Sequence, residues 1–288
     1  MRAAPTDRDV DELLSFGVVN LDKPPGPSAH QVVAWLRDRL GVDRAAHAGT
    51  LDPKVTGCLP VLTGDATRMA QVFDASDKAY IAVLELHGHA EDLDVLSAFE
   101  GPILQKPPRK SAVKRRLRTR AIHRLDVLEH EDRRALLRVE CESGTYIRKL
   151  CHDLGLAVGT GAHMGDLRRV ETVPFDDTDL VTMHDLTDAM AFYEDGDEDP
   201  IREVVAPGER ALTHLPSVTI APNAAREVAN GAPVYAPGVI DAEEVEDAEQ
   251  GTLLACYTPN GAAVCLGRLV GDPDAESGTV VDTERVLV

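Results

Sequence analysis

An acidic segment, YEDGDEDP at residues 193–200, divides this 288-residue sequence into two parts of different texture. The longer part before it mixes helical and strand-like periods, whereas the part after it consists of short β-like runs between Gly and Pro turns. Such a charged stretch is typical of a linker. We therefore expect an α+β domain with a mixed or antiparallel sheet at residues 10–190, and a small β-barrel-like domain at residues 210–288.

Periodicity in the first part predicts both helix and sheet. Residues 28–40 place apolar side chains every three or four positions, with Ser28 able to cap the start of a helix and Gly41 able to end it. Residues 80–86 and 136–141 alternate apolar and polar side chains, as half-buried strands do. The strand-like runs of the second part are residues 217–220, 252–257, 263–269 and 279–281, with one short helix at 223–230.

The charge composition indicates adaptation to high salt. The chain has 49 Asp and Glu against 30 Lys and Arg, for a net charge of −19, and only seven of the cations are Lys. High salt screens the self-repulsion of such a surface. An acidic protein that binds basic partners is the alternative interpretation. In a salt-adapted chain the acidic total does not argue against a nucleic-acid partner, because only local basic patches are informative.

Several features together predict a cytoplasmic protein. The N-terminus lacks the apolar core of a signal peptide, and no stretch approaches the eighteen apolar residues that a membrane span needs. The five cysteines are scattered without a Cys-x-x-Cys pair, which favours a reducing compartment over a disulfide framework or a zinc site. His87 and His89 lack a third ligand at a useful spacing, so we expect no metal.

One candidate for chemistry is Asp52, in the motif HAGTLDP at residues 47–53. Pro53 disfavours helical geometry at Asp52, so the carboxylate is expected on an extended turn where a ligand can reach it. Taken alone, an Asp before a Pro is better explained as a residue that caps the next turn.

A second candidate is the motif SGTYIRKL at residues 143–150, where a turn leads into a helix. The Tyr146 ring and the Arg148 guanidinium, two residues apart, can face one site. Tyr80 starts a strand in the segment Lys78-Ala79-Tyr80. Each of these two features also has a plainer interpretation. Arg148 can be a surface arginine at a strand–helix junction, and Tyr80 can be a core tyrosine.

A third candidate is the run QKPPRKSAVKRRLRTR at residues 105–120, which has eight cations and no acid. A chain that otherwise sheds positive charge keeps this cluster, which favours contact with the phosphates of RNA. The alternative is a solvated loop. Lys114 and Arg115, near its centre, are candidate contacts.

In this order the segments resemble the tRNA pseudouridine synthase B family. The resemblance is carried by LDKPPG at 21–26, HAGTLDPKVTGCLPV at 47–61, Lys78-Ala79-Tyr80, SGTYIRKLCHDLG at 143–155 and Leu167-Arg168-Arg169. SAVKR at 111–115 resembles the archaeal dyskerin-type branch in particular, the catalytic subunit of H/ACA ribonucleoproteins, and the tail from about residue 215 is similar to a PUA RNA-binding domain. Together with the acidic composition, this indicates a halophilic archaeon as the source.

The resemblance implies an isomerase that converts uridine to pseudouridine in RNA with no cofactor and no metal. Asp52 would be the nucleophile, Arg148 its cationic partner, and Tyr80 both the ring on which the extruded base stacks and a group that helps to remove a proton. The residues that would bind substrate are Tyr146, Leu167, Lys23, Lys114 and Arg115.

The same resemblance implies RNA partners (guide RNA, ribosomal RNA and the T-arm uridine of tRNA) and the small protein partners of an H/ACA ribonucleoprotein. A noncatalytic RNA-binding scaffold is the main alternative, disfavoured because a binder has no use for the Asp52 carboxylate beside RNA phosphates. A nucleoside hydrolase of the glycosidase type would need a second carboxylate, which these motifs do not supply.

Overall fold

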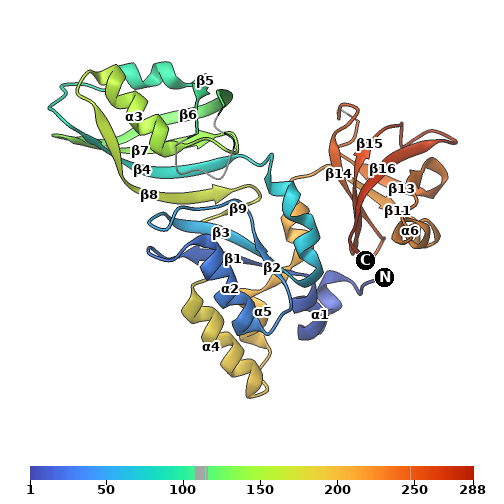
Figure 1. Ribbon diagram of the computed structural model, residues 1–288. Helices are drawn as coiled ribbons and strands as arrows, with labels where there is room; N and C mark the ends of the chain where they lie inside the picture. Colours follow the sequence, from blue (N-terminus) through green and yellow to red (C-terminus); the bar gives the residue numbers. More distant parts are fainter. Residues whose placement is uncertain (108–113, 115, 247) are drawn as a thin grey trace.

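The computed structural model describes residues 1–107, 114, 116–246 and 248–288, and contains two sheets (Figure 1). The first is a mixed sheet covered by helices, and the second is a curled sheet formed by residues of the last third of the chain. The predicted α+β class with a small barrel-like second domain is confirmed.

The first sheet has the strand order β10-β1-β3-β8-β4-β7-β6-β5, with β2 on β3 and β9 on β8. Strands β3 and β8 pair in parallel, whereas β4 lies antiparallel to both of its neighbours. The strands are β1 (Gly17–Lys23), β2 (Ala45–His47), β3 (Thr56–Thr63), β4 (Lys78–Leu86), β5 (Gly101–Gln105), β6 (Arg118–Glu131), β7 (Arg134–Cys141), β8 (Ala162–Thr172), β9 (Phe175–Asp176) and β10 (Ala206–Pro207).

Helices pack on both halves of this sheet. Helix α3 (Ile147–Val158) lies against β4 and β8, and α2 (Ala29–Leu40) lies against β2, β3 and α4 (Met183–Glu194) (Figure 1). Helix α2 has the predicted ends, because the Ser28 side chain accepts a hydrogen bond from the Gln31 N–H (3.2 Å) and Gly41 is left-handed with φ 65°. The remaining helices are α1 (Val10–Ser15), α5 (Asp199–Val204) and α6 (Pro222–Ala229).

The second sheet has the order β12-β16-β15-β14-β11-β13 and buries its own apolar core beneath α6. Strands β11, β14 and β15 lie where alternation and turn residues predict them, β16 runs further than expected, and β12 and β13 were not predicted. The strands are β11 (Ser217–Ile220), β12 (Val234–Tyr235), β13 (Val239–Glu243), β14 (Leu253–Tyr257), β15 (Ala263–Leu269) and β16 (Thr279–Val286).

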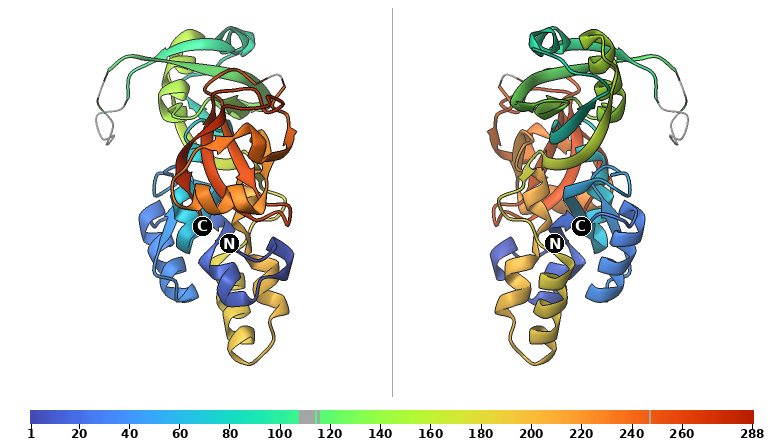
Figure 2. Two further views of the ribbon diagram at one scale, coloured as in Figure 1. Left: turned by 90° about the vertical axis from the view of Figure 1, so that its right-hand side faces the viewer. Right: turned by 90° about the vertical axis from the view of Figure 1, so that its left-hand side faces the viewer.

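The two sheets are joined by shared packing as well as by the chain. Arg8 donates two hydrogen bonds (2.7 and 2.8 Å) to the buried Glu209 carboxylate, which also accepts the Ala263 N–H from the second sheet (3.0 Å). The two ends of the chain meet at this junction (Figure 2). One apolar cluster spans it, with members Phe16, Val18, Leu62, Leu212, Ala255, Ala263, Leu266 and Leu287.

The predicted linker at residues 193–200 is wrong. This segment is the end of α4, a tight turn and the start of α5. Ile201 and Val205, directly after it, are buried in the core of the first sheet, and β10 then pairs with β1. The charged residues occupy the exposed turn of a helical hairpin, so a run of charge here indicates a solvated surface and not a break between domains.

This packing predicts how the chain responds to truncation. A fragment ending at residue 198 loses Ile201 and Val205 from the core, and burial of each contributes about 1.5–3 kcal/mol, a large part of a typical folding free energy of about 5–15 kcal/mol. We expect this fragment to lose cooperative thermal unfolding in molar KCl, whereas a fragment ending at residue 215 keeps it. Equal melting curves for the two fragments would show that residues 199–215 do not stabilise the first domain.

Candidate active site

Asp52 lies on a tight turn between β2 and β3. The Val55 N–H donates to the Asp52 carbonyl (3.0 Å), so residues 52–55 form a β-turn with Pro53 at its second position. The Asp52 side chain is half exposed, at 51%. The turn therefore presents the carboxylate at the surface, as the sequence predicts.

Lys23 was expected to bind substrate, and the structure corrects this. Its side chain is fully buried, and its ammonium donates to the carbonyls of Pro24, Pro53 and Val55 at 2.8–3.0 Å. All three ammonium donors are thereby used. Burial lowers the pKa of Lys23. Lys23 holds the turn that carries Asp52 and does not reach toward a ligand.

Substitution of Lys23 distinguishes these two roles. Lys23→Met fills the same space but leaves buried carbonyls unsatisfied, so we expect the free energy of unfolding to fall by about 1–3 kcal/mol. The rate of the chemical step should fall with it, because the Asp52 turn loses an anchor, while the affinity for RNA stays close to that of the parent. Thermal melts and RNA titrations measure both quantities. A weaker RNA affinity at unchanged stability would restore the substrate-binding role.

Arg148 lies in the first turn of α3 and forms an ion pair with Asp52, although the two residues are 96 positions apart. The position of Arg148 depends on Tyr146, the residue before the helix. A single side chain hydrogen-bonds both the N–H and the carbonyl of Tyr146. The buried Gln105 amide accepts the Tyr146 N–H (2.9 Å) and donates to the Tyr146 carbonyl (3.2 Å). This clamp fixes the start of α3 and with it the direction of the guanidinium.

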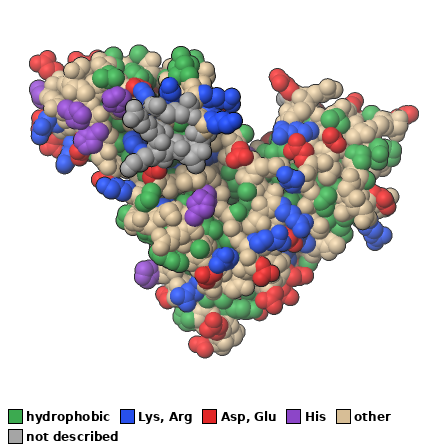
Figure 3. All heavy atoms as spheres, viewed as in Figure 1, with side chains coloured by type: hydrophobic (Ala, Val, Ile, Leu, Met, Phe, Trp, Pro, Cys, Tyr) green, Lys and Arg blue, Asp and Glu red, His purple; other side chains and the backbone are tan. Residues whose placement is uncertain are grey.

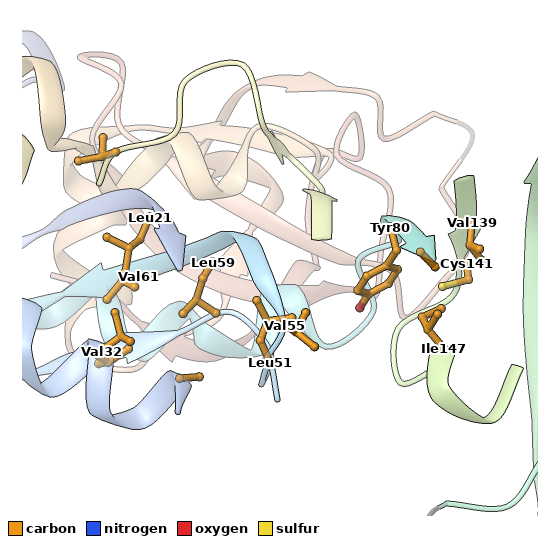
Figure 4. Packing of buried hydrophobic residues seen from close by; sticks show 14 of the residues in the cluster. Leu21, Val32, Leu51, Val55, Leu59, Val61, Tyr80, Val139, Cys141 and Ile147 are labelled. Carbon is orange, nitrogen blue, oxygen red and sulfur yellow. The ribbon is translucent and has the colours of Figure 1, made fainter. Parts of the chain in front are cut away.

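Tyr80 is at the second position after the start of β4. Its ring packs between Leu51 and Val55 on one side and Cys141 and Ile147 on the other (Figure 4). Leu51 precedes Asp52 and Ile147 precedes Arg148, so the ring lies between the two segments that form the pair. Only 9% of Tyr80 is exposed. Burial raises the pKa of its hydroxyl, an effect that the nearby Arg169 opposes.

Leu167 and Arg169 complete this face of the sheet from β8. Leu167 lies opposite Ala82 and Arg169 lies opposite Tyr80 in the β4–β8 register, so these four side chains share one face. Leu167 and Tyr146 are both half-buried, as pocket-lining residues are. The sequence places Arg169 in the motif Leu167-Arg168-Arg169 but indicates no role for it. Its neighbours on other strands, which the sequence alone does not show, reveal that role.

Two further titratable groups lie near Arg169: His47, which is half-buried, and Lys78, which is buried. The pKa of His47 falls to about 4, because of burial and then the positive fields of His30 and Arg169, so this imidazole is neutral at working pH. The pKa of Lys78 falls to about 8, because of burial and then Arg169. The Lys78 ammonium donates to the carbonyls of Phe73 and Ser76, just before β4. Both side chains were missed as parts of the site.

The structure describes part of the basic run at residues 105–120. Lys114 and Arg116 are exposed, and Arg115 lies outside the described residues. Arg120 pairs with Glu142 (2.9 Å), so one cation of the run has an acidic partner within the protein. Lys and Arg side chains gather on the part of the first domain that faces the second sheet across a notch (Figure 3).

In the part of the chain that the structure describes, no group of three or more His, Cys, Asp or Glu side chains is arranged to hold a metal ion. No helix among the described residues is long and apolar enough to cross a membrane.

Four family models match nearly the whole chain. They are the DKCLD domain at residues 3–33, the N-terminal domain of TruB family pseudouridylate synthases at 37–147, the C-terminal domain of tRNA pseudouridylate synthase B at 148–213, and the PUA domain at 216–287. A curated relative from Haloarcula marismortui, named "Probable tRNA pseudouridine synthase B", is 68% identical over 294 residues, covering 100% of this chain and 94% of the relative.

Solved structures agree with this. A chain of a Cbf5–Nop10–Gar1 complex has a TM-score of 0.94 and 43% identity, covering 100% of this chain and 89% of that one. A chain of an H/ACA ribonucleoprotein bound to a substrate RNA containing 2′-deoxyuridine has a TM-score of 0.92 and 41% identity, covering 99% and 89%.

Fold, site and relatives define a pseudouridine synthase with a C-terminal PUA domain, an isomerase that acts on RNA. The chain belongs to the TruB family, and among solved structures it is similar to archaeal Cbf5. The resemblance seen in the sequence is confirmed. The relative from a salt-loving archaeon also agrees with the interpretation of the acidic surface as adaptation to high salt.

Proposed function

We propose that this chain isomerises uridine to pseudouridine in RNA with Asp52 as the nucleophile, Arg148 as its partner and Tyr80 as the ring against which the base stacks. The observation that carries the proposal is the Asp52–Arg148 ion pair, together with Tyr80, which packs near Leu51 and Ile147, the residues that precede Asp52 and Arg148. A scaffold that only binds RNA has no use for a carboxylate facing its ligand, so this arrangement favours the enzyme over the scaffold.

The chemistry balances without an external reagent. The bond from uracil N1 to the ribose breaks, a bond from uracil C5 to the ribose carbon forms, the hydrogen on C5 leaves as a proton, and N1 ends with a hydrogen. As the nucleophile, the Asp52 carboxylate would divide this exchange into two easier steps, by attack on the ribose, by attack on the uracil ring, or by assisting an elimination. Tyr80, beside the reacting base, assists removal of the C5 proton.

Exposure of the pair suits a substrate that arrives as an extruded base. Asp52 and Arg148 are each about half exposed, so in the free protein their attraction is weakened by solvent. Extrusion of the base costs roughly a few kcal/mol, and stacking on an aromatic ring returns about 1–3 kcal/mol. The bound base then covers the pair and strengthens its electrostatics. Tyr146 and Leu167 would close the pocket around the base.

We further propose that the chain works within an H/ACA ribonucleoprotein, with ribosomal RNA as the main target and the T-arm uridine of tRNA as a second. The support is the similarity to Cbf5 chains in complexes with Nop10, Gar1 and substrate RNA. Exposed Lys114 and Arg116 place positive charge where RNA phosphates could contact it. A cytoplasmic location fits the five cysteines, all of which are buried free thiols.

The test assays the purified chain in molar KCl on an unmodified tRNA transcript, and then on a ribosomal RNA fragment with a matching guide RNA and the two small proteins. We expect pseudouridine at the guided uridine in the second assay. Activity on tRNA alone would make guide RNA dispensable for that substrate. If RNA is bound in both assays and pseudouridine forms in neither, the chain is a scaffold.

A further inference from the structure

We propose that Arg169 is the positioning residue that locks the Asp52 turn against the strand carrying Tyr80. The inference rests on the proposed function, since it concerns the geometry between the proposed nucleophile and the proposed stacking ring. It begins with the placement of Arg169 on β8, between β3 on one side and β4 on the other.

The side chain of Arg169 bonds to the chain on both sides of Asp52. Its Nη2 donates to the carbonyls of Ala48 and Gly49 at 3.1 and 3.4 Å, and its Nε donates to the carbonyl of Cys58 at 2.7 Å. Arg169 is only 1% exposed. Arg169 therefore links the two ends of the segment 48–58, and Asp52 lies between those ends in the sequence.

The backbone around Arg169 is built for close approach. In the parallel pairing of β3 and β8, Gly57 lies opposite Arg169, with φ 96°, and a Cβ at Gly57 would lie 2.2 Å from the Arg169 carbonyl oxygen. Only glycine fits there, so β3 comes close enough for the guanidinium to reach the Cys58 carbonyl. On the other side, Tyr80 is the direct partner of Arg169 in the β4–β8 register.

Lys23 and Arg169 therefore hold different parts of the backbone around Asp52. Lys23 holds the carbonyls of Pro53 and Val55, directly after the nucleophile, and Arg169 holds the backbone before and beyond that turn. Of the two, only Arg169 also lies beside Tyr80, where its charge opposes the rise in the pKa of the hydroxyl caused by burial. It is thus the one of these two cations that fixes the carboxylate relative to the ring.

A matched pair of variants tests this. Arg169→Met keeps the apolar stem and removes the guanidinium, and Arg168→Gln is the control. Arg168 is the adjacent residue on β8, but its guanidinium pairs with Asp22 through two bonds of 3.0 and 3.1 Å. Arg169→Lys keeps the charge with fewer directed donors, and it is the variant used if Arg169→Met does not fold.

We expect the single-turnover rate of Arg169→Met with guide RNA and partners to fall about 100-fold, because small displacements of reacting groups can slow a reaction by that factor. The dissociation constant for RNA should stay within about twofold of the parent, because the guanidinium is buried. Arg169→Lys should give an intermediate rate, and Arg168→Gln the parental rate.

Parental rates in both Arg169 variants would overturn the inference. A loss of rate that only follows the unfolded fraction, measured by circular dichroism, would also overturn it. Such a loss would show that Arg169 only stabilises the fold. If the parent itself forms no pseudouridine, the proposed function has failed, and this outcome is distinct because it appears before any Arg169 variant is compared.

Discussion

Asp52→Asn is expected to reduce pseudouridine formation by at least about a thousandfold while leaving the fold and RNA affinity nearly unchanged. The amide has the shape of the carboxylate but cannot act as an anionic nucleophile, so the loss falls on the chemical step. The Asp52 side chain is half exposed and contributes little to the core, so stability should hold. Single-turnover assays, RNA titration and thermal melts measure the three quantities.

The matched control for Asp52→Asn is Asp65→Asn. Asp65 is also partly exposed (38%) and paired with arginines, Arg44 at 3.0 Å and Arg68 at 3.3 Å, but it lies at the start of the helical segment after β3. It should keep the parental rate. Turnover by Asp52→Asn above about a thousandth of the parental rate would remove Asp52 from the role of nucleophile.

Arg148→Lys is expected to lower the rate of the chemical step by about 100-fold, despite keeping the charge. A lysine ammonium is a point charge on a flexible stem, whereas the guanidinium presents two parallel donors to a carboxylate. RNA affinity should change little, since the net charge is the same. Arg37→Lys, a surface arginine on α2 paired with Asp38, is the control and should be silent. A near-parental rate for Arg148→Lys would show that the guanidinium fork is not what holds Asp52.

Local patterns in the sequence predicted the elements that local physics determines. The period of apolar residues, Ser28 and Gly41 defined α2 to within one residue, and alternation located β4 and β7. Asp52 and Arg148 could be singled out because their motifs place a polar side chain next to a Pro or a helix start. Their pairing could not be derived from spacing, because it depends on how β3, β8 and β4 come together.

The predictions that the structure corrects failed because they depend on long-range packing. The segment 193–200 has the composition of a linker, but the apolar residues that anchor it, Ile201 and Val205, come just after it. The resemblance implies that Lys23 binds substrate, yet this lysine is buried and three carbonyls satisfy its ammonium. The role of Arg169 depends on Gly57 and Tyr80 flanking it on neighbouring strands. None of these neighbours can be read from one segment of sequence.

The most direct measurement uses target RNA that carries tritium at C5 of the uridine to be modified. Formation of the C5–ribose bond releases that hydrogen to solvent, so tritium release counts completed isomerisations, and an RNA titration shows that substrate is bound. We expect the chain with guide RNA and its small protein partners to release one tritium per target uridine, and Asp52→Asn to bind the same RNA and release none. Full binding without tritium release by the parent chain would contradict the account and leave an RNA-binding scaffold.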